Sequence, residues 1–507
     1  MKNITLSLLS LGVAAIFLSL SSWTPVVLVS THPDNLKYIN EAPEIAVDAF
    51  GNSYVTWQGY DGNDKEIYWA KIDSTGTLER IQKISTHEDN EMWNDYKPQI
   101  AVDASGNSYV TWHGSDGNDM EIYWVRIDGT KTPRTVKKIS VHPEGRENKD
   151  WLPKIALDAL GNSYITWYGS DGSNYDIYWV KISNSGTPEM VRKISTHEDN
   201  IGHYDSNPQI AIDASGNSYV VWHGCDKENC GEEPGDLEIY WVKIDGEGTP
   251  GTAQKIPPTD PDNIDTMAMV PQIAVDAEGN SYIVWCGMNE EDYDIYWVRI
   301  DAEGKIGAIK RISAYPNSNY GDYHPQIAAD MSGNTYITWC GSDEDNGEIY
   351  WVKIESSGTL ETVQRISNYL FSKSYDDSDP QITIDAAGNS YVVWKSFNGG
   401  FAEKFDQTIC WVKVDAEGTC GKVQRISSDR YSTHHDRCSR IAVDASGNSY
   451  VVWESHETII SQIFFTAHLP GPTLTIGTIA IIGIAALAIM GIILARKKII
   501  KVFIRNK

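Results

Sequence analysis

The sequence predicts an all-β fold, an eight-bladed β-propeller of four-stranded antiparallel blades, and three observations lead to it. A unit like residues 98–128 recurs along the chain, with copies that open at Pro43, Pro98, Pro153, Pro208, Pro271, Pro325, Pro380 and Ser439. The spacings of 55, 55, 55, 63, 54, 55 and 59 residues are typical of propellers, solenoids or arrays. Each copy also contains four short runs rich in aromatic and β-branched residues, and no helical periodicity appears between residues 25 and 470.

The four runs of each copy are expected to form antiparallel strands. In the second copy they are residues 100–103, 108–112, 121–127 and 135–140. The segment Asp103-Ala104-Ser105-Gly106, with Asp first and Gly last, indicates a type I turn between the first two strands. Four antiparallel strands joined by tight hairpins make one propeller blade.

The two ends of the repeat region are expected to meet. Residues 26–35 align with the fourth-strand segment 81–90, so the region begins with a fourth strand that has no copy of its own. The last copy has first, second and third strands at 440–444, 449–453 and 462–469, and then no fourth. The N-terminal strand is therefore expected to complete the eighth blade and close a propeller of residues 26–469, which removes two exposed strand edges.

Both chain ends carry membrane signals. Residues 473–495 contain no charge, and at about 1.5 Å per residue such a helix can cross a hydrocarbon core of roughly 30 Å. The basic tail 496–507 is expected to be cytoplasmic, with 470–472 as a short linker to the propeller outside. Residues 1–22 are expected to be a signal peptide or an uncleaved anchor. The sequence thus predicts a single-pass protein of the cell membrane.

Charge argues against a nucleic-acid partner. All 69 acidic residues lie between residues 26 and 472, whereas seven of the 42 basic residues lie outside that range. Binding of nucleic acid depends on clustered Lys and Arg that neutralise phosphates. An acidic surface fits a saline habitat, cation binding, basic partners or solubility alone.

Seven cysteines are few for 507 residues, so the hydrophobic core is expected to hold the fold. Cys225 and Cys230 flank an insertion in the fourth copy and are expected to form a local disulfide outside the cell. Cys420 and Cys438 could form a second one.

Most tryptophans recur at two positions of the repeat and are expected to pack between blades. Functional residues are instead expected where the copies differ, in the long connections from a fourth strand to the next first strand, on the face away from the membrane. Aromatic rings beside carboxylates would suit a carbohydrate, and the alternative is ordinary aromatics that cover the blade ends. The candidate ligand-binding residues are Trp93, Asp95, Tyr96, Trp151, Tyr204, Asp205, Tyr320, Asp322, Tyr323, Tyr375 and Asp376.

No cofactor and no metal site are expected, although calcium is possible. The loops 61–66 and 116–121 concentrate oxygen donors but lack the spacing of a helix-loop-helix calcium site, and simple hairpins are the alternative. The residue after each second-strand Trp includes two His and two Cys, which are soft metal ligands. These residues are expected to be spread among copies: Gln58, His113, Tyr168, His223, Cys286, Cys340, Lys395 and Glu454.

Catalytic motifs are missing from the sequence. No Gly-x-Ser-x-Gly elbow, phosphate-binding Gly-rich loop or His-Glu-x-x-His pair occurs. The sequence therefore predicts that the chain is not an enzyme, with a glycosidase or lyase as the alternative, because propellers host both.

The repeat also carries a family resemblance. The segment Ala101–Thr111 resembles the Asp-x-x-Gly-Asn-x-Tyr-Val-Thr unit of prokaryotic surface propellers known as SBBP-repeat proteins, and Asp116–Trp124 is similar to the Asp-Gly-Asn-x-Asp-Ile-Tyr segment of TolB-like propellers. The resemblance implies an archaeal envelope protein with a propeller used for binding, and it transfers no functional residue.

We expect a membrane-anchored binding or adhesion protein for an extracellular glycan or surface protein. A glycan-processing enzyme and a structural subunit of an envelope complex are the alternatives.

Overall fold

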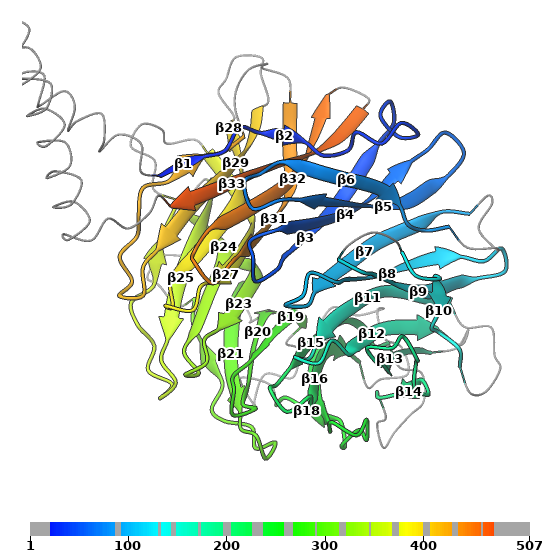
Figure 1. Ribbon diagram of the computed structural model, residues 1–507. Coiled ribbons are helices and arrows are strands. Elements are labelled where there is room, and N and C mark those ends of the chain that lie inside the picture. Colours follow the sequence, from blue (N-terminus) through cyan, green and yellow to red (C-terminus); the bar gives the residue numbers. More distant parts are fainter. Residues whose placement is uncertain are drawn as a thin grey trace, which may run out of the picture. The chain divides into compact units, whose positions relative to one another are not determined.

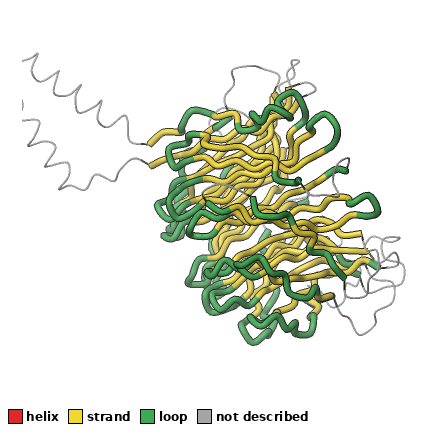
Figure 2. The backbone as a smooth tube through the Cα atoms, turned by 45° about the vertical axis from the view of Figure 1, so that its right-hand side comes forward, coloured by secondary structure: helices red, strands yellow, loops and turns green. Residues whose placement is uncertain are grey.

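Strands, turns and loops make up the part of the chain that the computed structural model describes, and no helix occurs there (Figure 2). The structure describes residues 21–86, 93–129, 133–142, 149–170, 174–195, 204–225, 237–257, 267–288, 292–313, 321–343, 346–367, 375–398, 406–427, 434–457 and 460–470. Nearly all of them belong to one compact unit, Trp23–Ala467. The prediction of an all-β protein is confirmed.

Each repeat copy contributes a first, a second and a third strand to the sheets of this unit (Figure 1). The first strands are β3 (Asn40–Val47), β7 (Asp95–Val102), β11 (Lys149–Leu157), β15 (Ser206–Ile212), β19 (Ala268–Val275), β23 (Tyr323–Ala329), β27 (Tyr375–Ile384) and β31 (His434–Val443). The second strands are β4 (Ser53–Tyr60), β8 (Ser108–Ser115), β12 (Ser163–Ser170), β16 (Ser218–Gly224), β20 (Ser281–Met288), β24 (Thr335–Asp343), β28 (Ser390–Asn398) and β32 (Ser449–Glu457). The third strands are β5 (Lys65–Ile72), β9 (Met120–Ile127), β13 (Tyr175–Ile182), β17 (Glu238–Ile244), β21 (Tyr293–Ile300), β25 (Asn346–Ile354), β29 (Asp406–Val414) and β33 (Ile460–Pro470).

The fourth strands are shorter than predicted after the first copy. They are β6 (Leu78–Lys83), β10 (Lys137–Lys138), β14 (Arg192–Lys193), β18 (Gln254–Lys255), β22 (Lys310–Arg311), β26 (Gln364–Arg365) and β30 (Gln424–Arg425). Within the described residues, copies one to six form separate four-stranded antiparallel sheets, as expected for propeller blades.

The last two copies share one sheet with the N-terminal strands β1 (Ser21–Trp23) and β2 (Val27–Leu28). Strand β2 pairs antiparallel with β33, with Val27 opposite Phe465 and Leu28 opposite Phe464. The amide of Val29 continues this ladder with a 2.8 Å hydrogen bond to Ile463 O. The N-terminal strand therefore lies where the repeat predicted it, beside the third strand of the last copy.

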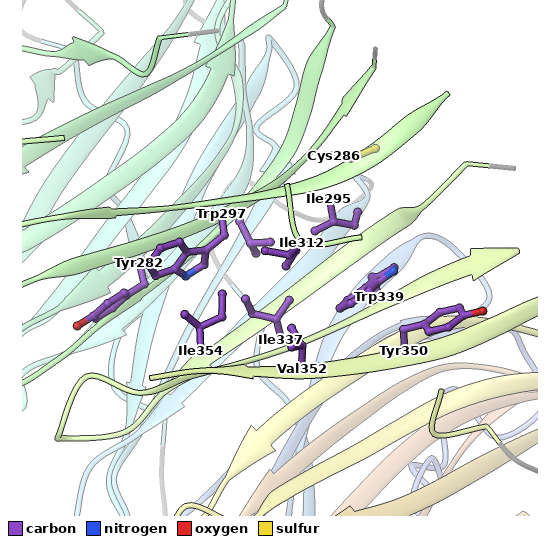
Figure 3. Packing of buried hydrophobic residues seen from close by; sticks show 11 residues of the cluster. Tyr282, Cys286, Ile295, Trp297, Ile312, Ile337, Trp339, Tyr350, Val352 and Ile354 are labelled. Carbon is purple, nitrogen blue, oxygen red and sulfur yellow. The ribbon is translucent and has the colours of Figure 1, made fainter. Parts of the chain in front are cut away.

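The first strands follow one another in chain order, and the last of them, β31, contacts the first, β3 (Figure 1). Large apolar side chains fill the space between consecutive sheets. Between the fifth and sixth copies, for example, Trp297 and Tyr282 pack with Trp339, Val352 and Ile354 (Figure 3). The repeated tryptophans are thus buried packing residues, as the repeat predicted.

A bulge interrupts every first strand just before its repeat proline, or before Ser439 in the eighth copy. The residue there is not glycine, yet its φ is positive in all eight copies, from 49° at Leu152 to 54° at His324 and Asp379. In the second copy the pairing of β7 with β8 slips between Tyr96 and Gln99. The first strands consequently begin up to six residues earlier than predicted, at Asp95 rather than Ile100 in that copy, and include part of the expected loop.

The membrane segments predicted from the sequence lie almost entirely outside the described residues. This is the case for residues 1–20 of the expected leader 1–22, for the expected span 473–495 and for the basic tail 496–507. The last two residues of the expected leader belong to β1. Among the residues that are described, we find no helix with the length and apolar character needed to cross a membrane.

Candidate functional site

The strongest candidate site is an aromatic cluster on the third copy, formed by Trp151, Tyr168, Tyr175 and Tyr204. The Trp151 ring stacks on Tyr168 and Tyr175, with ring centroids 5.5 and 6.1 Å away and interplanar angles of 29° for both pairs. Tyr204 extends the cluster from the segment before β15, with its centroid 5.0 Å from that of Tyr175. The Tyr204 end of the cluster is open to solvent, since Tyr204 is 39% exposed.

Local structure explains how four distant residues meet. Trp151 precedes the bulge at Leu152, which lets β11 continue along β12 with Trp151 opposite Tyr168. Tyr175 begins β13 opposite Ser170, at the end of the same hairpin, and pairs through its backbone with Tyr204. Burial and the neighbouring phenols raise the pKa of Tyr168 to about 12.

The sequence identified only half of this cluster. Trp151 and Tyr204 were predicted ligand-binding residues, whereas Tyr168 and Tyr175 were missed because they occupy ordinary strand positions of the repeat. Tyr168 carried a signal nonetheless: it is the one aromatic residue among the eight that follow a second-strand Trp.

The other predicted aromatic residues lie in separate places. Trp93 is 44% exposed and covers Gly117 of its own copy, where an added Cβ would meet Trp93 Nε1 at 3.0 Å. Tyr96 stacks on His113 at 5.7 Å, and Tyr323, 40% exposed, contacts Tyr293 at 5.2 Å. Tyr320 and the side chain of Tyr375 lie outside the described residues.

Three of the predicted carboxylates are buried, which contradicts their expected role in ligand binding. Asp95 and Asp205 are 0% exposed and Asp322 is 1% exposed. Asp205 and Asp322 accept hydrogen bonds from the indole nitrogens of Trp222 and Trp339 at 2.9 and 3.0 Å. The first strands begin early, so Asp95 belongs to β7, and Asp205 and Asp322 lie directly before β15 and β23. Asp205 and Asp322 therefore bond to tryptophans of the scaffold rather than to a ligand. Asp376 is exposed, but its Oδ1 accepts from the Gly347 amide at 3.0 Å.

The residues that follow the second-strand tryptophans connect consecutive copies. Gln58 Oε1 accepts from the bulge amide of Lys97 at 2.8 Å, and His223 Nδ1 accepts from Val270 N at 3.3 Å. Cys286 and Cys340 donate to backbone carbonyl oxygens of Asp322 and Asp377. His223, Cys286 and Cys340 therefore each contact the backbone of the next copy along the chain.

Two carboxylate clusters lie in the loops considered for calcium. The ligand atoms of Asp61, Asp64 and Glu66 lie within 4.8 Å of one another, as do those of Asp116, Asp119 and Glu121. A lysine already lies in each cluster: Lys83 Nζ is 3.1 Å from Asp61 and 2.5 Å from Glu66, and Lys138 pairs with Asp116 and Glu121. These ammonium groups supply the positive charge that an ion would otherwise bring.

A hydrogen-bonded chain of polar residues follows the repeat prolines. Arg440 Nε donates to Glu44 Oε1 at 3.0 Å, Gln99 Nε2 donates to the same oxygen at 3.2 Å, and Lys154 Nζ donates to Gln99 Oε1 at 3.4 Å. Burial lowers the pKa of Lys154, and Arg440 and Lys97 act in the same direction. This series of side-chain hydrogen bonds joins the eighth, first, second and third copies.

The cysteines agree only partly with expectation. Cys225 is disulfide-bonded, while its expected partner Cys230 lies outside the described residues, so the pairing stays a prediction. Cys420 and Cys438 are free thiols, so the second disulfide is wrong.

Comparison with known proteins finds solved structures with a similar fold but identifies no family. No protein-family model matches the chain. No curated protein matches it either, so the resemblance to SBBP-repeat and TolB-like propellers and the archaeal source stay predictions. Solved structures that resemble it include a polysaccharide lyase of family PL25, an ulvan lyase, with 12% identity, a TM-score of 0.44 and coverage of 80% of this chain and 94% of that one.

Two further similar structures are glycosidases. The α-L-arabinanase of Penicillium chrysogenum is 11% identical, with a TM-score of 0.41 and coverage of 67% of this chain and 100% of the arabinanase. The NanB sialidase of Streptococcus pneumoniae is 12% identical, with a TM-score of 0.34 and coverage of 88% and 70%. These proteins have β-propeller-type folds.

All three are named as glycan-degrading enzymes, which contradicts the expectation that this chain is not an enzyme. At these identities the similarity shows the fold alone. What the chain binds is therefore argued below from its own residues.

Proposed function

We propose that the chain is a cell-surface glycan-binding protein that recognises a neutral glycan through the cluster of Trp151, Tyr168, Tyr175 and Tyr204. The observation that carries the proposal is the contact of four aromatic rings from four separate segments, with Tyr204 open to solvent. Aromatic rings offer apolar faces for the C–H edges of sugars, and tyrosine hydroxyl groups can bond to sugar hydroxyls.

Charge favours a neutral glycan. The chain has a formal net charge of −27 at pH 7, and such a surface repels polyanions at a distance. The cluster itself consists of one tryptophan and three tyrosines and contains no carboxylate or ammonium group.

The proposal includes an eight-bladed propeller held at the cell surface. Eight repeat copies, the pairing of β2 with β33 and the contact of β31 with β3 support eight blades in a closed ring. The uncharged segment 473–495 and the basic residues after it support a single-pass anchor with a cytoplasmic tail.

Isothermal titration of the full-length protein in detergent against a panel of neutral and acidic polysaccharides tests the proposal. We expect binding of a neutral member, with Trp151→Ala and Tyr204→Ala each weakening it at least tenfold. Trp93→Ala is the matched control, because Trp93 is also an exposed aromatic residue but lies beside Gly117 of the second copy.

Two results would contradict the proposal: no binding across the panel, or binding unchanged by both cluster substitutions. The same samples are assayed for newly formed reducing ends and unsaturated products. Product formation that is lost with Tyr204→Ala would make the alternative, a glycan-processing enzyme, the function of this cluster.

A further inference from the structure

A groove at the junction of the fifth and sixth copies carries an excess of positive charge. The volume open to water in it is about 340 Å³. One carboxylate, that of Asp301, lines the groove together with three cationic side chains, which are Arg299, Lys305 and Lys310. The groove is therefore positive, whereas the chain as a whole has a formal net charge of −27.

The preceding junction, between the fourth and fifth copies, holds a groove of the same construction but of opposite charge. The corresponding residues line it, and its volume open to water is about 480 Å³. Thr249 and Gln254 stand there at the positions of Lys305 and Lys310. One lysine and two carboxylates remain in this second groove, and they are Lys243, Asp245 and Glu303. The positive charge is thus not a general property of the repeat.

The two lysines of the positive groove are not needed for its fold. Threonine stands at the position of Lys305 in five other copies, as Thr77, Thr187, Thr249, Thr359 and Thr419. Lys310 Nζ donates to the carbonyl oxygen of Gly358 in the next copy. In the sixth copy Gln364 makes the same contact without a charge, since its Nε2 donates to Gly418 O at 2.9 Å.

Arg299 lacks the partners that the corresponding cation of the sixth copy has. Lys353 pairs with Glu361, eight residues further on, at 3.3 Å and donates to Ala416 O in the next copy at 3.2 Å. Gly307 occupies the position of that glutamate in the fifth copy. Within the described part of the chain, Arg299 forms no ion pair, and its Nε is buried without a hydrogen-bond partner. The groove thus contains a guanidinium group that no carboxylate neutralises.

We propose that this groove binds a tetrahedral oxyanion, the sulfate or phosphate group of a larger molecule, through Arg299, Lys305 and Lys310. A guanidinium group offers a planar fork of N–H donors and an ammonium group offers three, which suits an anion with oxygen atoms on every side. The hydroxyl groups of Ser356 and Ser357 line the groove from the sixth copy as further donors. The inference is independent of the glycan proposal, because the groove shares no residue with the aromatic cluster.

Isothermal titration of the full-length protein in detergent tests the site. The probes are inorganic sulfate, inorganic phosphate, glucose 6-sulfate and glucose 6-phosphate, at constant ionic strength because salt screens such contacts. We expect one site per chain, and the comparison of the two sugar esters identifies the oxyanion that the groove prefers. The inorganic probes contain no sugar ring, so their binding reports on the groove and not on the aromatic cluster.

Lys305→Thr and Lys310→Gln should each weaken oxyanion binding about fivefold or more, because each removes a charged hydrogen-bond donor. Both substitutions insert a residue that other copies use at the same position, so the fold should be retained. Lys243→Gln is the matched control, since it removes one cation from the groove of the preceding junction and should leave oxyanion binding unchanged.

Three results would overturn the proposal. The first is no binding of any of the four probes by the unaltered protein. The second is unchanged binding in the double variant Lys305→Thr/Lys310→Gln, with folding verified by its melting curve. The third is an equal loss in Lys243→Gln, which would show that the overall charge of the chain, rather than this groove, determines oxyanion binding.

Discussion

The indole nitrogen of Trp222 donates a 2.9 Å hydrogen bond to Asp205 Oδ1, and neither side chain is exposed to solvent. The same pair recurs with Trp167 and Asp150, and with Trp339 and Asp322. A buried indole donor needs an acceptor, so the carboxylate at the start of the first strand is part of the scaffold.

Asp205→Ala is therefore expected to lower the free energy of unfolding by about 1–3 kcal/mol, the usual cost of a buried donor left without a partner. Urea unfolding followed by tryptophan fluorescence measures the change. Asp205→Asn is the matched control and should cost less, because Asn40 accepts from Trp57 in the first copy at 2.9 Å. Equal losses in the two variants would show that the charge, rather than the acceptor, is required.

His223 makes stability depend on pH. Its Nδ1 accepts from Val270 N and its Nε2 lies 2.7 Å from Ser206 Oγ, and burial lowers the pKa of the imidazole to about 4. A lowered pKa means that the folded protein resists protonation. The contribution of neutral His223 to the free energy of unfolding is therefore complete above pH 6.5. It is lost as the pH falls from 6.5 to 4, and the total loss is about 3 kcal/mol.

His223→Gln should reduce this loss, because a glutamine in the same position of the first copy accepts the bulge amide without titrating. Unfolding free energies at pH 7 and pH 4.5 provide the measurement. The reciprocal variant Gln58→His should add a similar loss in the same window. Identical pH dependence of His223→Gln and the unaltered protein would contradict the assignment.

The bulge before each proline predicts a stabilising substitution. Val270 has a φ of 52°, a left-handed conformation that is unfavourable for β-branched residues. Asn207 occupies the same position in the fourth copy with the same φ, and asparagine adopts this conformation more readily. Val270→Asn is expected to raise the unfolding free energy by about 1 kcal/mol. Asn207→Val should lower it by a similar amount, and thermal melting of both variants checks the opposite signs.

The repeat made the sheet order and the N-terminal strand predictable, because Asp-x-x-Gly turns and strand patterns recur at fixed spacing. The bulge was not predictable, since a residue before proline rarely adopts a left-handed conformation. Because the bulge was missed, Asp95, Asp205 and Asp322 were placed in open loops, whereas they are buried in a first strand or directly before one.

The aromatic cluster was predictable only in part, for a related reason. Trp151 and Tyr204 differ from the repeat around them and so attracted attention. Tyr175 begins a third strand, and its contact with Tyr204 depends on the pairing between one copy and the next. Spacing within one copy does not contain that information.

Glu44 is expected to hold the polar chain of Arg440, Gln99 and Lys154 together. Its Oε1 accepts from both Arg440 and Gln99, and Gln99 in turn accepts from Lys154. Glu44→Gln should lower the unfolding free energy by about 1–2 kcal/mol, less than for a fully buried pair, because the Arg440 side chain is 35% exposed.

Lys154→Gln should have the opposite effect. Burial lowers the pKa of Lys154, so its charge opposes folding at neutral pH, and glutamine stands at this position in five copies. Once Glu44→Gln has removed the carboxylate, Lys154 and Arg440 remain without their shared negative charge, and the gain from Lys154→Gln should grow. A double-mutant cycle by urea unfolding measures this coupling, which we expect to exceed about 0.5 kcal/mol. Strictly additive effects would show that Lys154 does not sense Glu44 through Gln99.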